Sequence, residues 1–208
     1  VPLMIGARDM AYPRLNAFGF WTFFFAGLFV ASSFFFNAAP NGGWFAYTPL
    51  TGPRYSPGKN LDFWVLGVQL LGVSSIAGSI NFAATVLRLR APGMSINRLP
   101  LFVWTTFVTA FIILFAMPSL TVAASLLMLD RFLGTVFYSA AAGGDAVLWQ
   151  HLFWAFGHPE VYILVLPPMG IISEVVPVFS RKPLFGYMFV AWSSVAIAFL
   201  GMTVWAHH

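Results

Sequence analysis

The sequence predicts an all-α fold, a polytopic bundle of membrane-spanning helices, and three observations support this prediction. Hydrophobic residues make up 60% of the 208 residues. Charged residues make up only 8%, whereas soluble domains carry about a quarter. Five long apolar runs follow one another, separated by segments rich in Pro, Gly and Asn. So few charges cannot cover a water-soluble surface, and so many apolar residues exclude intrinsic disorder.

Each apolar run reaches the length of about 20 residues that a helix needs to cross a bilayer. The first run has no charge, the second has one acid at its edge, and the third is uncharged with one proline. The fourth carries several polar side chains, and the fifth is apolar until a final His pair. We therefore expect five spans, at residues 15–36, 62–87, 101–129, 147–172 and 185–208.

Composition excludes other classes of protein. The chain has no cysteine, which excludes a disulfide framework and thiolate metal sites. Its net charge is +4, but the basic residues are scattered among apolar runs, so we expect no nucleic-acid partner. Because the chain opens at Val1 and stops within an apolar stretch, we expect it to be an internal segment of a longer polypeptide.

Basic residues are divided unevenly between the two ends of the predicted bundle. One end carries three of them, Arg54, Lys59 and Arg131. The other end carries seven, Arg8, Arg14, Arg88, Arg90, Arg98, Arg181 and Lys182. Connections rich in Lys and Arg stay on the cytoplasmic side of a membrane, or on the matrix side in a mitochondrion. We expect the first helix to run outward and the last residues to lie near the outer side.

The fourth span contains an unusual concentration of polar side chains. Trp154, His158 and Tyr162 are spaced four residues apart and form one stripe on a helix. Glu160 points to the opposite face, and Pro159 removes a helical hydrogen bond and favours a kink. Ionisable groups inside a membrane usually mark a pathway or a site. This span is therefore the first candidate functional region.

Two ionisable residues of this span are interpreted differently. His151 lies on the same stripe, but a single histidine in a helix bundle is more often a hydrogen-bonded packing residue. Glu160 has no Lys or Arg in its span, so its carboxyl group must pair elsewhere, contact water or stay protonated. We expect Glu160 to be functional and to hold its proton at rest.

The chain ends in a second candidate feature, the adjacent pair His207 and His208. Adjacent residues on a regular helix diverge by about 100°, so both can face one centre only where the helix unwinds. With His158 they supply three imidazoles without a thiolate or carboxylate. Such a set suits copper or zinc, and copper binds more tightly in the Irving–Williams order. The pair alone is a weak signal, which His158 strengthens.

A polar trail begins at the basic end of the bundle. Asp9 precedes the first span, Asn16 lies at its start, and Ser74, Ser75 and Asn81 lie on the second span. These residues support a water wire from Asp9 towards the fourth span. An equally acceptable interpretation is that Asp9 pairs with a nearby arginine and that the serines bond to their own helix.

Four segments together resemble the catalytic subunit of the haem–copper oxygen reductases, subunit I of cytochrome c oxidase. They are residues 149–162 (WQHLFWAFGHPEVY), 204–208 (VWAHH), 100–104 (PLFVW) and 1–6 (VPLMIG). The resemblance covers the whole chain as the central portion of a twelve-helix subunit. It implies an enzyme that reduces O2 to water with electrons from cytochrome c and pumps protons outward.

The resemblance also implies a role for each candidate residue of the two His-bearing segments. His158, His207 and His208 match the ligands of the CuB-type copper centre that faces the oxygen-binding haem. Tyr162 matches a tyrosine that is covalently linked to this histidine and supplies a proton and an electron when the O–O bond breaks. Trp154 matches an aromatic wall residue near the copper.

The remaining polar residues match a proton channel. Glu160 matches the gating acid at its inner end, and Asp9 matches its entrance. Asn16, Ser74, Ser75 and Asn81 match polar positions between them. The expected position of Asp9 on the inner side, from the distribution of basic residues, agrees with this assignment.

The resemblance implies cofactors and partners beyond this chain. The full-length subunit binds two haems, but none of the four histidines here matches a haem ligand. The implied partners are a dicopper-bearing subunit II, a subunit III, cytochrome c and membrane lipid. Arg8, where many mitochondrial members have proline, and the extended loop from Asn37 to Leu61 favour the bacterial cytoplasmic membrane, with the mitochondrial inner membrane as the alternative. We expect the isolated segment to be inactive.

Three alternatives remain open. A quinol oxidase of the same family shares the histidines and the glutamate, so the electron donor is not fixed. A proton-conducting membrane transporter would use Glu160 and the serines without binding metal. An inert structural segment would bind neither haem nor copper by itself.

Overall fold

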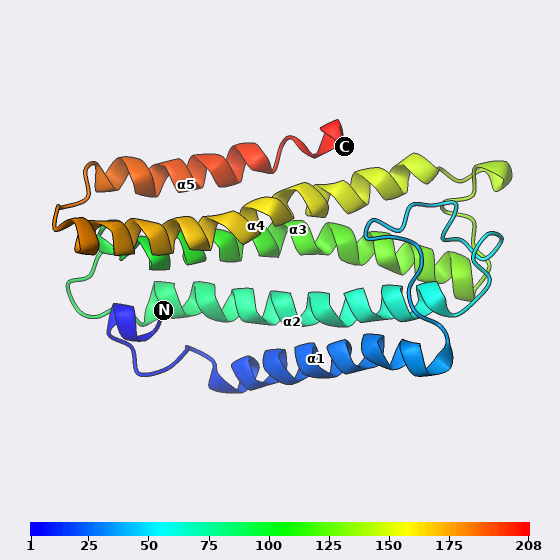
Figure 1. The fold of residues 1–208 in the computed structure, drawn as a ribbon, viewed down its shortest axis with the longest axis horizontal. Coiled ribbons are helices and arrows are strands. Elements are labelled where there is room, and N and C mark those ends of the chain that lie inside the picture. Colours follow the sequence, from blue (N-terminus) through cyan, green and yellow to red (C-terminus); the bar gives the residue numbers. More distant parts are fainter.

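The computed structural model describes all 208 residues and contains five α-helices and no strand. Figure 1 shows the five helices side by side, with successive helices running in opposite directions. The helices are α1 (Pro13–Ser32), α2 (Asn60–Arg88), α3 (Leu101–Phe132), α4 (Ala146–Ser180) and α5 (Tyr187–Gly201). The all-α prediction is confirmed.

Local sequence explains where several helices begin. Proline suits the first turn because it lacks an N–H that would be unpaired there, and α1 begins with Pro13. At α4, the Asp145 side chain accepts a hydrogen bond from the main-chain N–H of Val147, which caps the helix. Before α5, Gly186 adopts a left-handed conformation with φ of 67° and turns the chain back towards the bundle.

The first four helices overlap the predicted runs, but α4 continues to Ser180, past the expected end at residue 172, and α1 ends as a regular helix at Ser32, before residue 36. Four helical segments are long and apolar enough to cross a membrane: Pro13–Phe36, which is α1 with the short 3-10 helix that follows it, then α2, α3 and α4. Helix α5 has 15 residues and ends at Gly201, so the regular helix does not continue to residue 208. Membrane crossing by residues 185–208 therefore stays a prediction.

Two apolar clusters hold the bundle together, one towards each end of the helices. The first joins α2, α3 and α5 through side chains such as Val86, Trp104 and Ala191. The second joins the long connection after α1 to α2, α3 and α4, and Trp149 and Phe153 are fully buried in it. Helix α3 contributes to both clusters and forms the centre of the layer.

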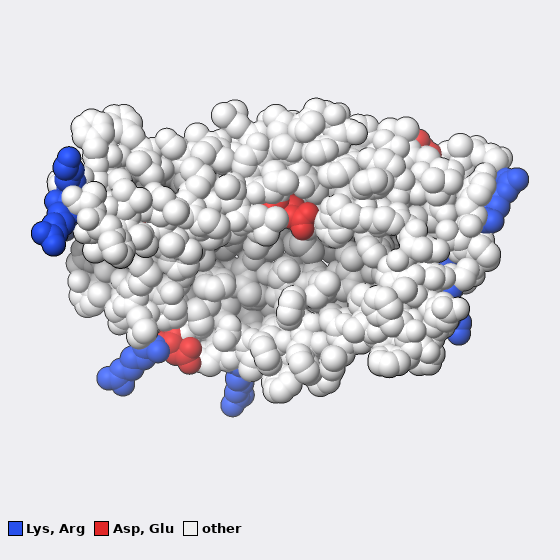
Figure 2. Space-filling model, in the orientation of Figure 1, with Lys and Arg blue, Asp and Glu red and all other residues white.

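Most of the apolar surface is not covered by the chain itself. Only 50 of 208 residues are buried, so the outer faces of the helices need an apolar environment. The exposed side chains include a ladder of aromatic rings on α1. In Figure 2, basic side chains lie towards the two ends of the molecule, and the middle of the visible face is white apart from one acidic group. This distribution is that of a membrane protein.

A buried arginine holds the connection between α1 and α2. Arg131, at the end of α3, donates to the Asp62 carboxylate at 2.5 Å. It also donates to the main-chain carbonyl groups of Thr51, Ser56 and Gly58. Because its side chain is only 4% exposed, these four partners replace the water that the guanidinium loses.

Candidate metal centre

The centre begins on one face of α4. Trp154, His158 and Tyr162 follow one another at helical spacing, and the ring centroids of His158 and Tyr162 are 5.0 Å apart. His158 is buried, with 8% of its surface exposed. The stripe expected from the four-residue spacing is therefore present. His151 lies outside the cluster, is exposed and forms no side-chain hydrogen bond, so the expected hydrogen-bonded packing role is not seen.

The chain after α5 brings the terminal histidines to this face. Beyond Gly201 a turn leads into a short 3-10 helix, Trp205–His207, which packs against α4. One ligand nitrogen each from His158, His207 and His208 lie within 4.8 Å of one another. The Nδ1 atom of His158 is 3.1 Å from Nε2 of His208. Unwinding at the end of α5 thus lets two adjacent imidazoles face one point, as the sequence required.

Each terminal ring is held by a separate contact. Nδ1 of His207 bonds the main-chain carbonyl of Val204, which leaves its Nε2 free. The His208 ring stacks on Trp154, with centroids 3.9 Å apart and planes 5° from parallel. Trp154 in turn donates from Nε1 to the Tyr47 hydroxyl at 2.6 Å. No local motif marks Tyr47 as part of the site, because it lies in a long connection 107 residues from Trp154.

The second nitrogen of His158 has no partner. Its Nε2 is buried and forms no hydrogen bond. If Nδ1 offers its lone pair towards the other imidazoles, the proton of a neutral ring must lie on Nε2. A buried N–H without an acceptor is unfavourable. Three converging neutral imidazoles and this unpaired atom fit a copper or zinc ion held at Nδ1 of His158, with the Tyr162 ring close by.

Glu160 is separate from the three histidines. It is half-buried on α4 and forms no ion pair or hydrogen bond. No Lys or Arg neutralises its carboxyl group, as the absence of Lys and Arg from this span predicts.

The polar trail is only partly connected. Asp9 and Asn16 are exposed, and neither Asp9 nor any nearby arginine forms an ion pair. Ser74 donates to the main-chain carbonyl of Gly19 on α1 at 2.6 Å, so the alternative in which it bonds to its own helix is not seen. Ser75 uses no side-chain hydrogen bond, although its carbonyl accepts from Ser79. Side-chain contacts therefore do not join Asp9 to Glu160.

Asn81 has a role that the sequence did not reveal. It is fully buried, and its side-chain oxygen accepts from the Tyr12 main-chain N–H while its amide donates to the Tyr12 carbonyl. Four residues further along α2, the Thr85 hydroxyl accepts from the main-chain N–H of Ala11. These bonds fix the segment that carries Asp9 to α2.

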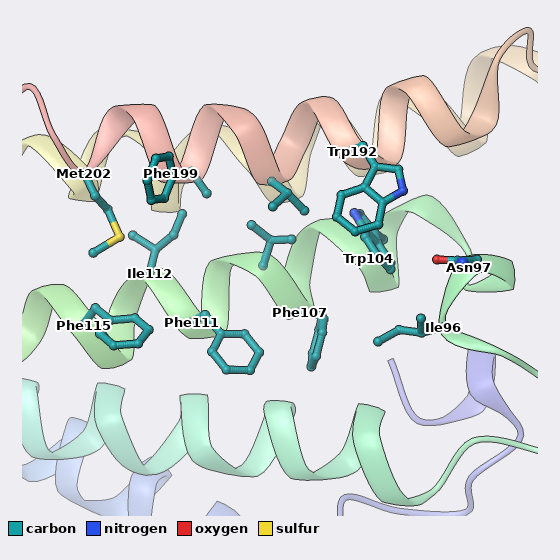
Figure 3. A pocket seen from close by; sticks show the side chains of 13 residues that line it. Ile96, Asn97, Trp104, Phe107, Phe111, Ile112, Phe115, Trp192, Phe199 and Met202 are labelled. Carbon is teal, nitrogen blue, oxygen red and sulfur yellow. The ribbon is translucent and has the colours of Figure 1, made fainter.

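An apolar cleft lies between α3 and α5, beside the end of α5 that leads to the centre. Its volume is about 470 Å³, and all but one of its lining residues are hydrophobic. Figure 3 shows Trp104 and Trp192 at one end of it and Phe115, Phe199 and Met202 at the other. No ionisable group lines it, so it offers no catalytic chemistry of its own.

Comparison with known proteins gives relatives over the full chain. A family model described as Cytochrome C and Quinol oxidase polypeptide I matches residues 1–208. The chain is 55% identical over 208 residues to cytochrome c oxidase subunit 1 of Bacillus subtilis (strain 168), covering all of this chain and 33% of that protein. It is 54% identical to the proteins of the same name from Bacillus sp. (strain PS3) and Alkalihalophilus pseudofirmus, covering 34% and 33% of them. The chain thus spans about a third of the length of these relatives.

Proposed function

Because the chain belongs to the family of cytochrome c and quinol oxidase polypeptide I, we propose that it is the copper-binding part of a terminal respiratory oxidase. The full-length enzyme would reduce O2 to water with electrons from cytochrome c and pump protons. The observation that supports this proposal is the convergence of His158, His207 and His208 beside the Tyr162 phenol. A proton-conducting transporter does not require three imidazoles that converge on one point.

The three histidines would hold the metal through one nitrogen each. His158 would use Nδ1, and His207 would use Nε2, because its Nδ1 bonds the Val204 carbonyl. His208 would also use Nε2, with its ring plane fixed by Trp154. Bound copper would supply a site for the reduction of O2, and the haem ligands would come from outside these 208 residues.

Tyr162 would be joined to His158 and would supply a proton and an electron to oxygen. The link would form between Nε2 of His158 and a ring carbon ortho to the Tyr162 hydroxyl. The N–H and C–H bonds break, the N–C bond forms, and two protons and two electrons pass to O2. This bond would remove the unpaired buried N–H of His158.

Glu160 would relay protons to the oxygen chemistry. Its lone position on α4, without a cationic partner, lets it hold and release a proton. Asp9 would admit protons at the basic end, and Asn16, Ser74, Ser75 and Asn81 would lie along the route. Since their side chains do not form a continuous hydrogen-bonded chain, water would have to bridge the gaps.

The family and the exposed apolar surface indicate the complex and the membrane in which the protein works. A subunit of this kind works in a multi-subunit complex, for which we propose a dicopper-bearing subunit II and a subunit III as neighbours. Bacterial relatives favour the bacterial cytoplasmic membrane over the mitochondrial inner membrane.

The test is performed on the purified full-length oxidase that contains this chain. Copper and haem are quantified, and O2 consumption is measured with reduced cytochrome c and with a quinol as alternative donors. We expect copper bound by this chain, two haems and turnover with cytochrome c. Turnover with quinol alone would show that quinol, not cytochrome c, is the electron donor. Absence of both copper and haem would overturn the assignment as an oxidase and favour a transporter.

A further inference from the structure

The Tyr162 ring packs against the last residue of α5, where a glycine leaves room for it. Gly201 is the last residue of that helix and is buried. A Cβ atom built on Gly201 would lie 2.5 Å from Cε2, 2.6 Å from Cδ2 and 3.1 Å from Cζ of Tyr162. The first two distances are shorter than real Cβ contacts, and the third is tighter than most of them. The phenol ring therefore occupies the space that a side chain at residue 201 would take.

Other contacts do not explain how the phenol is held. The Tyr162 hydroxyl forms no hydrogen bond within the chain, so the ring is placed by packing alone. One side of it approaches the His158 ring, with centroids 5.0 Å apart. The Gly201 main chain lies against the ring as well. Movement of the ring away from Gly201 would change its distance or angle to His158.

The glycine is not explained by helix termination. Glycines that end helices usually adopt the left-handed conformation that other residues avoid. Gly201 has no positive φ, in contrast to Gly186 and Gly143. Alanine would fit the main-chain conformation at residue 201, so only the contact with Tyr162 requires a glycine there.

We propose that Gly201 is a positioning residue that sets the Tyr162 ring beside His158, so that the His–Tyr bond can form. This inference rests on the proposed function, because the bond forms by loss of the Nε2 hydrogen of His158 and a ring hydrogen of Tyr162. Their two protons and two electrons pass to O2, the substrate named above. Gly201 touches neither metal nor oxygen and acts only through the ring.

The experiment replaces Gly201→Ala in the full-length oxidase complex. Gly78→Ala on α2 and Gly27→Ala on α1 are matched controls, because a Cβ at either position meets no atom within 4 Å. Two readouts are taken: the position of the Tyr162 ring in a cryo-EM map, and the mass of the proteolytic peptide that contains both His158 and Tyr162. A linked peptide is two hydrogens lighter than an unlinked one. Copper is quantified in each variant.

We expect the ring to move away from His158 and most of the linked peptide to be lost in Gly201→Ala, while copper stays bound because the three histidines are intact. Both controls should keep the ring position and the link. An unmoved ring, or loss of copper together with the link, would overturn the role of Gly201. An unlinked wild-type peptide would instead refute the proposed link, and the ring position would still test the packing role.

Discussion

The three imidazoles of the centre differ in what fixes them, and this decides how each responds to substitution. His208 is held by stacking on Trp154, whose N–H is anchored on Tyr47. His207 is held by its own main chain at Val204. His158 belongs to the middle of α4 and keeps its position without either of them. The terminal rings can therefore be removed without unfolding the helices.

Replacement of a terminal ring tests the metal assignment. His208→Ala in the full-length oxidase removes one of three ligand nitrogens. We expect the copper at this centre, counted beyond that of the dicopper-bearing subunit, to fall by at least about tenfold, because outer-shell changes alone cost about 10–100-fold in metal affinity. Helix content by circular dichroism should not change. His151→Ala is the control, since His151 is exposed and outside the cluster. Full copper in His208→Ala would contradict the three-histidine site.

Glu160 can be tested without altering the metal ligands. Glu160→Gln keeps the shape of the side chain but cannot release a proton, and proton transfer by a positioned group contributes about 10²–10⁴-fold. We expect O2 consumption to fall by at least about tenfold, with copper content retained. The infrared C=O band of a protonated carboxylic acid should disappear in the variant. A band that survives the substitution would show that Glu160 does not hold the proton.

Tyr138, in the connection between α3 and α4, predicts a pH dependence of stability. It is 2% exposed and donates to the Ala123 carbonyl. Burial, and then the nearby Asp130 carboxylate, raise the pKa of the Tyr138 hydroxyl above its ordinary value of 10.0. A raised pKa in the folded state means that this stabilisation is complete below pH about 10 and is lost as the pH rises further.

The measurement is the melting temperature of the oxidase as a function of pH. Tyr138→Phe should lower it near neutral pH, since the lost hydrogen bond is worth about 1 kcal/mol. Above pH about 10 the variant should lose less stability than the wild type. Tyr55→Phe serves as the control, because Tyr55 is exposed. Parallel pH curves for wild type and Tyr138→Phe would contradict the interpretation.

At the scale of elements, the connections matter as much as the helices. The long connection between α1 and α2 carries Tyr47, and through Trp154 it reaches the His208 ring. Arg131 binds three main-chain carbonyls of that connection together with Asp62. A single buried cation thus binds several groups of the connection at one end of the bundle, and the bonds from Trp149 to the Phe45 carbonyl and from Trp154 to Tyr47 hold it as well.

Arg131→Ala should destabilise the protein. Breaking a buried ion pair by removing one partner costs about 3–5 kcal/mol, because Asp62 and the three carbonyl groups lose their donor. We expect a lower melting temperature and easier proteolysis of the connection. Arg54→Ala is the control, since Arg54 is exposed and forms no ion pair or side-chain hydrogen bond. Equal stability of the two variants would contradict this role.

Helix positions could be predicted from the sequence, and helix ends only in part. Apolar runs of more than 20 residues placed α1 to α4, because the length of a run reports the thickness of a bilayer. The run at 185–208 gave no sign that α5 ends at Gly201, since Met202 to Trp205 are also largely apolar. Only the need for two adjacent histidines to face one centre indicated an unwound end.

At the scale of the whole molecule, the candidate site could also be predicted only in part from the sequence. The four-residue spacing of His158 and Tyr162 is a local property, so the sequence contained it. The Tyr47–Trp154 bond and the contact between Gly201 and the Tyr162 ring join segments far apart in the chain, and no periodicity encodes them. The residues of the polar trail left a water wire and purely structural bonds equally acceptable, and the bonds of Asn81 to the Tyr12 main chain join elements that no local pattern relates.

The bundle also predicts an orientation in the membrane. Successive helices are antiparallel (Figure 1), so the connection between α2 and α3 lies at the opposite end from that between α1 and α2. Because the α2–α3 end carries most of the Lys and Arg residues, it should face the cytoplasm. Asp9, at that end, would then take protons from the inside, as pumping outward requires.

The absence of cysteine from the chain makes this orientation measurable. Ser95→Cys and Lys59→Cys place one exposed thiol at each end, and intact cells are treated with a membrane-impermeant thiol reagent. Labelled peptides are identified by mass spectrometry, so thiols elsewhere in the complex do not interfere. We expect Lys59→Cys to react in intact cells and Ser95→Cys to react only after the membrane is opened. The opposite order would place Asp9 outside, where it could not admit protons for outward pumping.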